Sequence, residues 1–267
     1  MMFRIIFFML CAMGVFSVEA GAQLFLENGK ESLSVSAGEH LNGSLLIHNT
    51  SSAVQNVKVY WEDFKYKPPY DGSKDFLPAG TVPGSASQWV SFAPQTFSIP
   101  ALSQQYVNYT VAVPDQIQEG HYGVLFFEST SDVAKNASGV TIITRVGCLF
   151  FIEPKDKTKK AVIQDIALKT NSVTANFVNQ GNVILIPHTT YYIMDSAGLV
   201  TLRGDNKKLY IPPGVGASLE IPLKKPLGQG RYTLVVNSDM EDGDVVVKEI
   251  GLAVDASGQM SIENSQD

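Results

Sequence analysis

The sequence contains little cysteine, no tract of basic residues and only one long apolar run. Its two cysteines are Cys11 and Cys148, and Cys11 lies in an N-terminal segment that we expect to be removed. The remaining chain can form no internal disulfide, so its core must be held by apolar burial. The net charge of −6 argues against nucleic acid and anionic membrane surfaces as the main partners.

The single apolar run, Ile5 to Val18, follows Arg4 and has the length of a signal-peptide core rather than of a membrane span. Ala20-Gly21-Ala22 resembles a cleavage site. We therefore predict a signal peptide at residues 1–22, with cleavage after Ala20 as the alternative. No second run of about 18 apolar residues follows. The mature chain is expected to be periplasmic or secreted and to contain no integral membrane segment.

The periodic segments alternate with period two, which is typical of β-strands, and none shows a helical stripe. Turn-forming pairs such as Asn28-Gly29 and Asp71-Gly72 separate them. Short strands at this spacing predict sandwiches or barrels. The clearest predicted strands are 41–48, 54–64, 106–113, 122–128, 140–152, 174–178, 189–194, 218–221, 232–236 and 245–254.

An internal repeat divides the chain into two similar halves. Each half contains, in order, a strand that ends in Asn, an Ile-Pro pair, a Pro and a Gly-x-Tyr triplet. In the first half these are Asn49, Ile99-Pro100, Pro114 and Gly120-His121-Tyr122. In the second half they are Asn179, Ile211-Pro212, Pro226 and Gly230-Arg231-Tyr232. Gly-x-Tyr before an apolar strand resembles the tyrosine corner of immunoglobulin-like sandwiches, where the Tyr bonds to upstream backbone. The sequence therefore predicts an all-β protein with two tandem immunoglobulin-like β-sandwiches after a signal peptide.

The repeat also predicts the domain limits. The first domain spans 23–154 and carries an inserted loop at 66–87, which is rich in Pro, Gly and Ser and has no counterpart in the second half. A short charged linker leads to the second domain at 161–255, and a polar tail follows at 256–267. A linker of this length predicts a restricted angle between the domains.

We find no arrangement of residues that predicts catalysis, a metal site or a cofactor. The four histidines are scattered, and the sequence has neither a nucleophile elbow nor a phosphate-binding loop. The acidic stretch Asp239 to Asp244 is where a hairpin turn is expected, and it lacks the terminal Glu of a calcium loop. Cys148 lies in an apolar alternating run and is interpreted as a buried hydrophobic residue. The protein is therefore expected not to be an enzyme.

Two features could bind a partner. The strand that ends the first domain is largely apolar on both faces, so it is either covered on both sides or offered to a partner. Its candidate partner-binding residues are Ile142, Thr144, Arg145, Val146, Cys148 and Phe150. The alternative is the 66–87 loop with the aromatic residues Tyr66, Tyr70 and Trp89, since long loops on rigid sandwiches often bind ligands.

The run from Arg145 to Pro154, followed by a charged hinge, resembles the periplasmic pilus-assembly chaperones of the PapD-like superfamily, as does Asn49-Thr50 after an early strand. In that family an Arg on the first strand and a Lys on the last strand anchor the carboxylate of a pilus subunit. The stretch from Gln23 to Val35 contains only Lys30 as a basic residue, so the anchoring Arg is not matched.

This resemblance implies an extracytoplasmic chaperone-like protein that caps or assembles β-rich pilus or surface subunits by strand addition. The alternative is a structural or adhesive scaffold protein at the cell surface or in the periplasm, which binds through the 66–87 loop. The first domain also resembles surface proteins of Gram-positive bacteria that bind peptidoglycan or WxL proteins. A protein partner is expected in either case.

Overall fold

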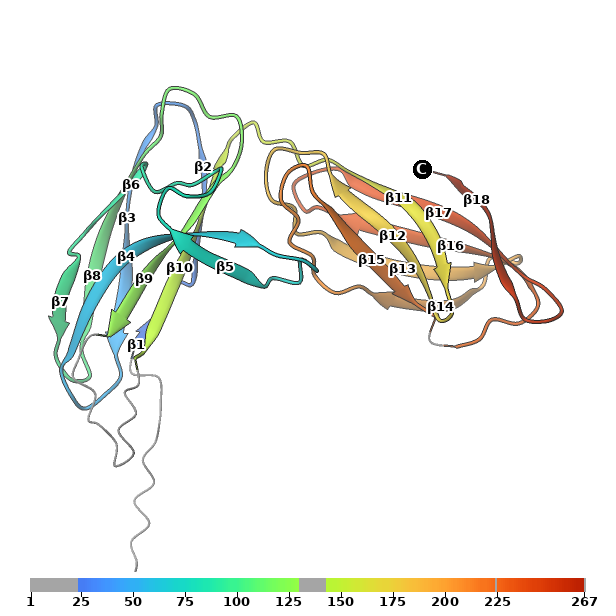
Figure 1. Ribbon diagram of the computed structural model, residues 1–267, viewed down its shortest axis with the longest axis horizontal. Coiled ribbons are helices and arrows are strands. Elements are labelled where there is room, and N and C mark those ends of the chain that lie inside the picture. Colours follow the sequence, from blue (N-terminus) through green and yellow to red (C-terminus); the bar gives the residue numbers. More distant parts are fainter. Residues whose placement is uncertain (1–23, 130–142, 224, 267) are drawn as a thin grey trace, which may run out of the picture.

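The computed structural model describes residues 24–129, 143–223 and 225–266 of the chain. In this part the chain forms strands and no helix. Figure 1 shows two β-sandwiches in tandem, joined at one end and inclined to each other. The predicted all-β fold with two sandwiches is confirmed. The predicted signal peptide lies outside the described residues.

The first sandwich is built from strands β1 to β10. Their bounds are β1 Leu24–Leu26, β2 Lys30–Val35, β3 His40–Asn49, β4 Gln55–Tyr66, β5 Lys74–Pro78, β6 Val90–Ala93, β7 Thr96–Ile99, β8 Gln104–Ala112, β9 His121–Ser129 and β10 Arg145–Pro154. One sheet has the order β1-β3-β8-β6 and the other β2-β10-β9-β4-β5, with β7 paired to β4. All pairs are antiparallel except β2 with β10, which is parallel.

The second sandwich is built from strands β11 to β18. Their bounds are β11 Ala161–Lys169, β12 Ser172–Asn179, β13 His188–Asp195, β14 Val200–Asp205, β15 Gly216–Pro222, β16 Gly230–Asp239, β17 Val245–Val254 and β18 Met260–Gln266. The sheets have the orders β11-β12-β15 and β14-β13-β16-β17-β18. Residues 260–266, expected to lie in a polar tail, form β18, whose Met260 and Ile262 pack against the core.

Each sandwich buries its own apolar core between its two sheets, because alternate strand residues point inward. In the first core Trp61 packs on Phe150 with ring centroids 5.3 Å apart, and Cys148 is completely buried. In the second, Phe177 and Tyr191 are among the largest fully buried side chains. The expected burial of Cys148 is confirmed.

The repeated Asn closes the end of an early strand in each sandwich. The Nδ2 of Asn49 donates to the Ile99 carbonyl at 3.1 Å, and that of Asn179 donates to the Ile211 carbonyl at 2.8 Å. In both cases the side-chain oxygen accepts a backbone N–H two residues further on, at 2.9 Å from Ser51 and 2.8 Å from Gly181. Within each sandwich, the repeated Asn therefore bonds to the repeated Ile-Pro, and this buried contact explains why the two recur together.

The two tyrosines of the repeat have different roles. The hydroxyl of Tyr232 donates to the Gly228 carbonyl at 3.0 Å, which is the predicted bond to upstream backbone. The Tyr122 hydroxyl instead accepts the Ile184 N–H at 2.9 Å, across the domain junction. The prediction of a tyrosine corner is therefore wrong for Tyr122. Gly-x-Tyr occurs in both domains, but the hydrogen-bond partner of Tyr122 comes from the second domain, whereas that of Tyr232 comes from the backbone upstream of it.

The 66–87 segment is not a free loop. It contains β5, which pairs with β4 as a hairpin that projects toward the second sandwich (Figure 1). Beyond β5, the buried carboxylate of Asp63 accepts the backbone N–H of Thr81 at 2.8 Å and that of Val82 at 3.2 Å. It also accepts the Ser85 hydroxyl at 2.6 Å. One buried side chain thus holds the returning half of the segment against the sheet.

Replacing Asn179 with Ala should lower the free energy of unfolding by about 2–3 kcal/mol, because the buried Val183 carbonyl and the Gly181 N–H lose the Asn179 side chain as their partner. Chemical denaturation followed by fluorescence measures the change. Asn28→Ala is the control, because its exposed amide bonds only to the nearby Glu31 and its loss should be almost neutral. A cost for Asn179→Ala no larger than for Asn28→Ala would contradict the prediction.

Candidate partner-binding edge and interdomain cavity

Strand β10 has a neighbour on one side along most of its length, and on the other side along a shorter part of it. All residues from Arg145 to Ile152 pair with β9, whereas pairing with β2 begins at Leu149. Among the described residues, no strand pairs with Arg145–Cys148 on the β2 side. This half of β10 is therefore an open sheet edge.

The backbone groups that face this opening can be assigned from the hydrogen bonds of the ladder. The Thr144 carbonyl accepts the Ser129 N–H at 2.9 Å, and the Leu149 N–H donates in the opposite direction, to the Gly29 carbonyl, at 3.0 Å. Because this direction alternates along an antiparallel strand, Arg145 and Gly147 direct their N–H and C=O groups toward the opening. These are the groups that an added strand would bond.

The side chains predicted to bind a partner lie in different places. Cys148 and Phe150 are fully buried in the core of the first sandwich, and the partly buried Val146 packs against the same core. Thr144 immediately precedes β10. Ile142 lies outside the described residues. The inward face of β10 therefore fills the protein's own core, and the open edge offers mainly its backbone.

Arg145 lies on the outward face of the sheet in an aromatic and acidic setting. Its guanidinium is 3.3 Å from the centroid of the Phe126 ring and forms an ion pair with Glu62. Gly147 allows this packing, because a Cβ at that position would lie 2.8 Å from the Phe126 ring. Arg145 thus already has a carboxylate partner within the chain.

Cys148 has the properties of a packing residue rather than of a nucleophile. Burial, with the charge of Glu31 as a smaller cause, raises the pKa of the Cys148 thiol to about 12. The thiolate that would be needed for nucleophilic or metal chemistry is therefore disfavoured at neutral pH. The described residues also contain no group of three or more His, Cys, Asp or Glu side chains placed to hold a metal ion.

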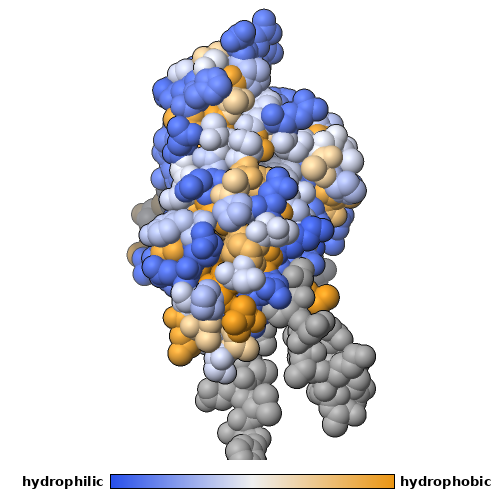
Figure 2. All heavy atoms as spheres, turned by 90° about the vertical axis from the view of Figure 1, so that its left-hand side faces the viewer, coloured by the Kyte–Doolittle hydropathy of each residue, from blue (hydrophilic) through white to orange (hydrophobic). Residues whose placement is uncertain are grey.

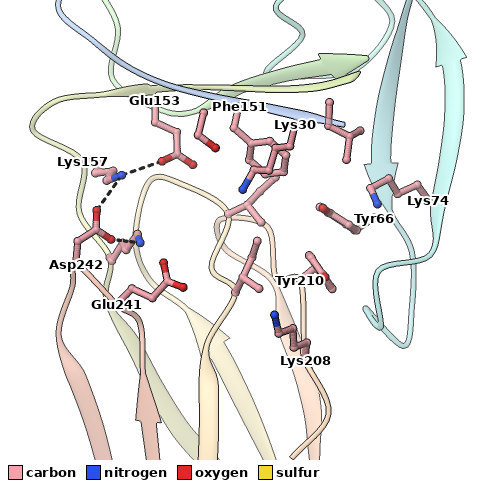
Figure 3. Close-up of a pocket in the computed structure, with 15 residues that line it drawn as sticks. Lys30, Tyr66, Lys74, Phe151, Glu153, Lys157, Lys208, Tyr210, Glu241 and Asp242 are labelled. Atoms are coloured by element: carbon pink, nitrogen blue, oxygen red, sulfur yellow. Dashed lines mark hydrogen bonds and ion pairs between the residues drawn. The ribbon is translucent and has the colours of Figure 1, made fainter. Parts of the chain in front are cut away.

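A cavity of about 450 Å³ lies between the two sandwiches (Figure 3). Its residues come from β2, β4, β5 and β10, the linker and three segments of the second domain; they include Lys30, Tyr66, Lys74, Phe151, Glu153, Lys157, Lys159, Ile184, Lys208, Tyr210, Glu241 and Asp242. Five of these residues are lysines, so the cavity can receive an anionic group.

The lysines of the cavity fall into two sets. Lys157 and Lys159 form ion pairs with Asp242, and Lys157 also pairs with Glu153. Lys30, Lys74 and Lys208 have no ion-pair partner within the described part of the chain (Figure 3). The Nζ of Lys30 lies 4.2 Å from the Phe151 ring centroid. Burial lowers the pKa of Lys74, whose Nζ lies 4.7 Å from the Tyr66 ring centroid.

The β4–β5 hairpin forms one wall of the cavity and contacts the second domain. Tyr66 stacks on Tyr210 with centroids 5.0 Å apart, and the Tyr210 N–H donates to the Tyr70 carbonyl at 2.8 Å. Trp89 packs on His121, with ring centroids 3.8 Å apart. The three aromatic residues of the loop-binding alternative, Tyr66, Tyr70 and Trp89, therefore contact the protein itself.

Asn182 joins the two domains and the linker by hydrogen bonds. Its side-chain Nδ2 donates to the Gln118 carbonyl at 2.7 Å, its Oδ1 accepts the Thr158 N–H at 2.7 Å, and its carbonyl accepts the Gly120 N–H at 2.9 Å. Together with the bond between Tyr122 and Ile184, these contacts restrict the interdomain angle. The sequence analysis did not identify Asn182 as a junction residue, because its partners in the first domain and the linker are distant along the chain.

No family model and no curated protein sequence matches this chain. Among solved structures, a chain of the chaperone–tip adhesin complex of CFA/I fimbriae biogenesis matches with a TM-score of 0.55 and 14% identity, covering 85% of this chain and 97% of that chain. The class 5 fimbriae chaperone CfaA matches with a TM-score of 0.53 and 14% identity, covering 84% and 97%. The resemblance to pilus-assembly chaperones is therefore confirmed at the level of the fold.

We expect the Asp242 ion pairs to give the protein a measurable pH dependence. The hydrogen bond from Lys159, and then that from Lys157, lower the pKa of Asp242 to about 2 from an ordinary value of 3.8. The stability that they contribute is therefore complete above about pH 5 and is lost as the pH falls through 2. Because the Asp242 side chain is 56% exposed, the contribution is at most about 1 kcal/mol.

Melting temperatures of Asp242→Asn and of the unchanged protein, measured from pH 7 to pH 2, test this expectation. The difference should be constant above about pH 5 and should have fallen to a small fraction of that value at pH 2. Glu241→Gln is the matched control, because it removes a neighbouring carboxylate that pairs with neither Lys157 nor Lys159. A difference that persists unchanged at pH 2 would exclude the ion pairs as its cause.

Proposed function

We propose that the protein is an extracytoplasmic chaperone-like binding protein that caps or assembles β-rich pilus or surface subunits by strand addition. The single observation that carries the proposal is the open edge at Arg145–Cys148. A partner strand would bond the outward backbone groups of Arg145 and Gly147 and extend the sheet. The similarity of fold to fimbrial chaperones and the predicted signal peptide support this proposal.

The cavity supplies a second point of contact for such a strand. Lys30 pairs with Leu149, the first residue of β10 beyond the open edge. A strand that fills the opening parallel to β10 would therefore present its terminal carboxylate beside Lys30. Because the resemblance implies a carboxylate anchor, we assign that role to the unpaired lysines Lys30, Lys74 and Lys208, in place of the Arg and Lys of the family.

The proposal predicts a change in amide exchange that is confined to the open edge. In the free protein the amide hydrogens of Arg145 and Gly147 should exchange rapidly, because no strand in the described part of the chain bonds them. The Leu149 amide should be protected, because it donates to the Gly29 carbonyl. On addition of a co-purified β-rich partner, Arg145 and Gly147 should become protected. Formation of a complex without protection at these two amides would contradict strand addition.

A substitution at the exposed end of this edge should weaken capture without harming the fold. Ile143 is 60% exposed, so Ile143→Asp should change stability by less than about 0.5 kcal/mol. It should weaken partner binding at least about tenfold, because the charge must be desolvated beside the added strand. Leu199→Asp, at a residue that is 68% exposed in the second sandwich, is the matched control. Calorimetric titration and melting curves compare the two; equal affinities would refute the proposed edge.

A further inference from the structure

The outward face of the sheet β1-β3-β8-β6 carries no charged residue on its strands. Alternation and burial place the outward positions on even residues of β3 and β8. The outward residues are Phe25, His40, Asn42, Ser44, Leu46, His48, Ser91, Ala93, Gln104, Tyr106, Asn108, Thr110 and Ala112. None is Asp, Glu, Lys or Arg. We call this set of residues the uncharged face.

Other exposed sheet faces of the same protein do carry charge. Lys58, Glu62 and Glu128 lie on the outward side of β4 and β9, and Glu220 and Glu249 are exposed on β15 and β17. Across the chain, 17% of residues are charged and the net charge is −6. The uncharged face therefore differs in composition from the other exposed sheet faces, and this difference extends over four strands.

The chemistry of the uncharged face suits contact with protein. Phe25 and Tyr106 are 54% and 51% exposed. The amides and hydroxyls around them can both donate and accept hydrogen bonds; the Thr110 hydroxyl, for example, donates to the Asn42 Oδ1 at 2.7 Å. Loss of charge with retention of aromatic residues is the composition of interface centres. Figure 2, which looks toward the side bearing β6, β7 and β8, shows hydrophobic areas interspersed with hydrophilic ones rather than one apolar patch.

We propose that the uncharged face binds the same face of a second copy of this chain, forming a two-fold symmetric dimer. In such a dimer the two contacting faces are identical, so a face with charges of one sign would repel the same face of the second copy. Amides and hydroxyls are complementary to their own kind, because each supplies both donors and acceptors. For a chain with a net charge of −6, an uncharged contact avoids the largest electrostatic cost of self-association.

The size of the uncharged face agrees with a weak dimer. Four strands about 4.8 Å apart, with a rise of about 3.3 Å per residue, give on the order of 500 Å² per copy. The total of about 1,000 Å² is at the small end of specific interfaces. Strand β10 belongs to the other sheet, so dimerisation leaves its open edge and the cavity accessible. The dimer does not depend on the proposed function.

Analytical ultracentrifugation of the purified protein between about 1 and 500 μM tests the proposal, because an interface of this size is expected to dissociate at micromolar concentrations. The unchanged protein should pass from monomer to dimer across this range. Ser44→Lys and Ser44→Asp should each weaken the dimer at least about tenfold, because like charges then meet across the interface. Mixing the two variants in equal amounts should restore a dimer.

Ser218→Lys is the matched control, because Ser218 is also an exposed strand serine but lies in the second sandwich; its dimerisation should equal that of the unchanged protein. Melting curves check that all variants remain folded. A protein that stays monomeric at about 500 μM overturns the proposal. So does a Ser44→Lys variant that dimerises normally, since the contact then uses another face. Loss of the dimer without recovery in the mixture overturns the symmetric arrangement.

Discussion

The chain crosses from one sheet, as β1, to the other sheet, as β2, and this crossing determines which residues of β10 have a neighbouring strand on both sides. Strand β1 pairs with β3 in one sheet, and after Glu27 to Gly29 the chain enters the other sheet as β2, beside β10. Because β2 starts opposite Leu149, the preceding residues of β10 are left with one neighbour. The same crossing brings Lys30 to the cavity. The open edge of β10 and the position of Lys30 in the cavity thus both result from the crossing between the sheets at Glu27 to Gly29.

The second constraint is the fixed relation between the sandwiches. The Tyr122 hydroxyl, the Asn182 side chain and the stack of Tyr66 on Tyr210 hold the junction at separate places. The linker makes a further contact with the second domain, in which Lys157 and Lys159 share Asp242. A hinge with one such contact could rotate about it, whereas several separate contacts restrict that rotation. The same contacts therefore restrict the shape of the cavity.

The sequence predicted the fold well because the determinants of the fold are local. Alternating apolar residues identify strands, and the repeated Asn and Ile-Pro reflect a contact that each sandwich makes with itself. The sequence predicted the site less well, because the site is made by neighbours that are distant along the chain. Cys148 and Phe150 alternate as partner-binding residues would, but periodicity cannot tell a face turned to a partner from one turned to the core. Nothing near Lys30 in the sequence indicates Lys74, Lys208 or the cavity that they share.

The cavity walls come from both sandwiches and from the β4–β5 hairpin, and this has a thermodynamic consequence. Any ligand that contacts all three walls binds one relative orientation of the domains better than the others. Linkage then requires the converse with equal magnitude: whatever holds the domains in that orientation raises the affinity for the ligand. The hydrogen bonds that join Asn182 to Gln118 and Gly120 lie outside the cavity lining, yet they are therefore energetically coupled to whatever occupies the cavity. Residues that never touch a ligand can in this way set how tightly it is held.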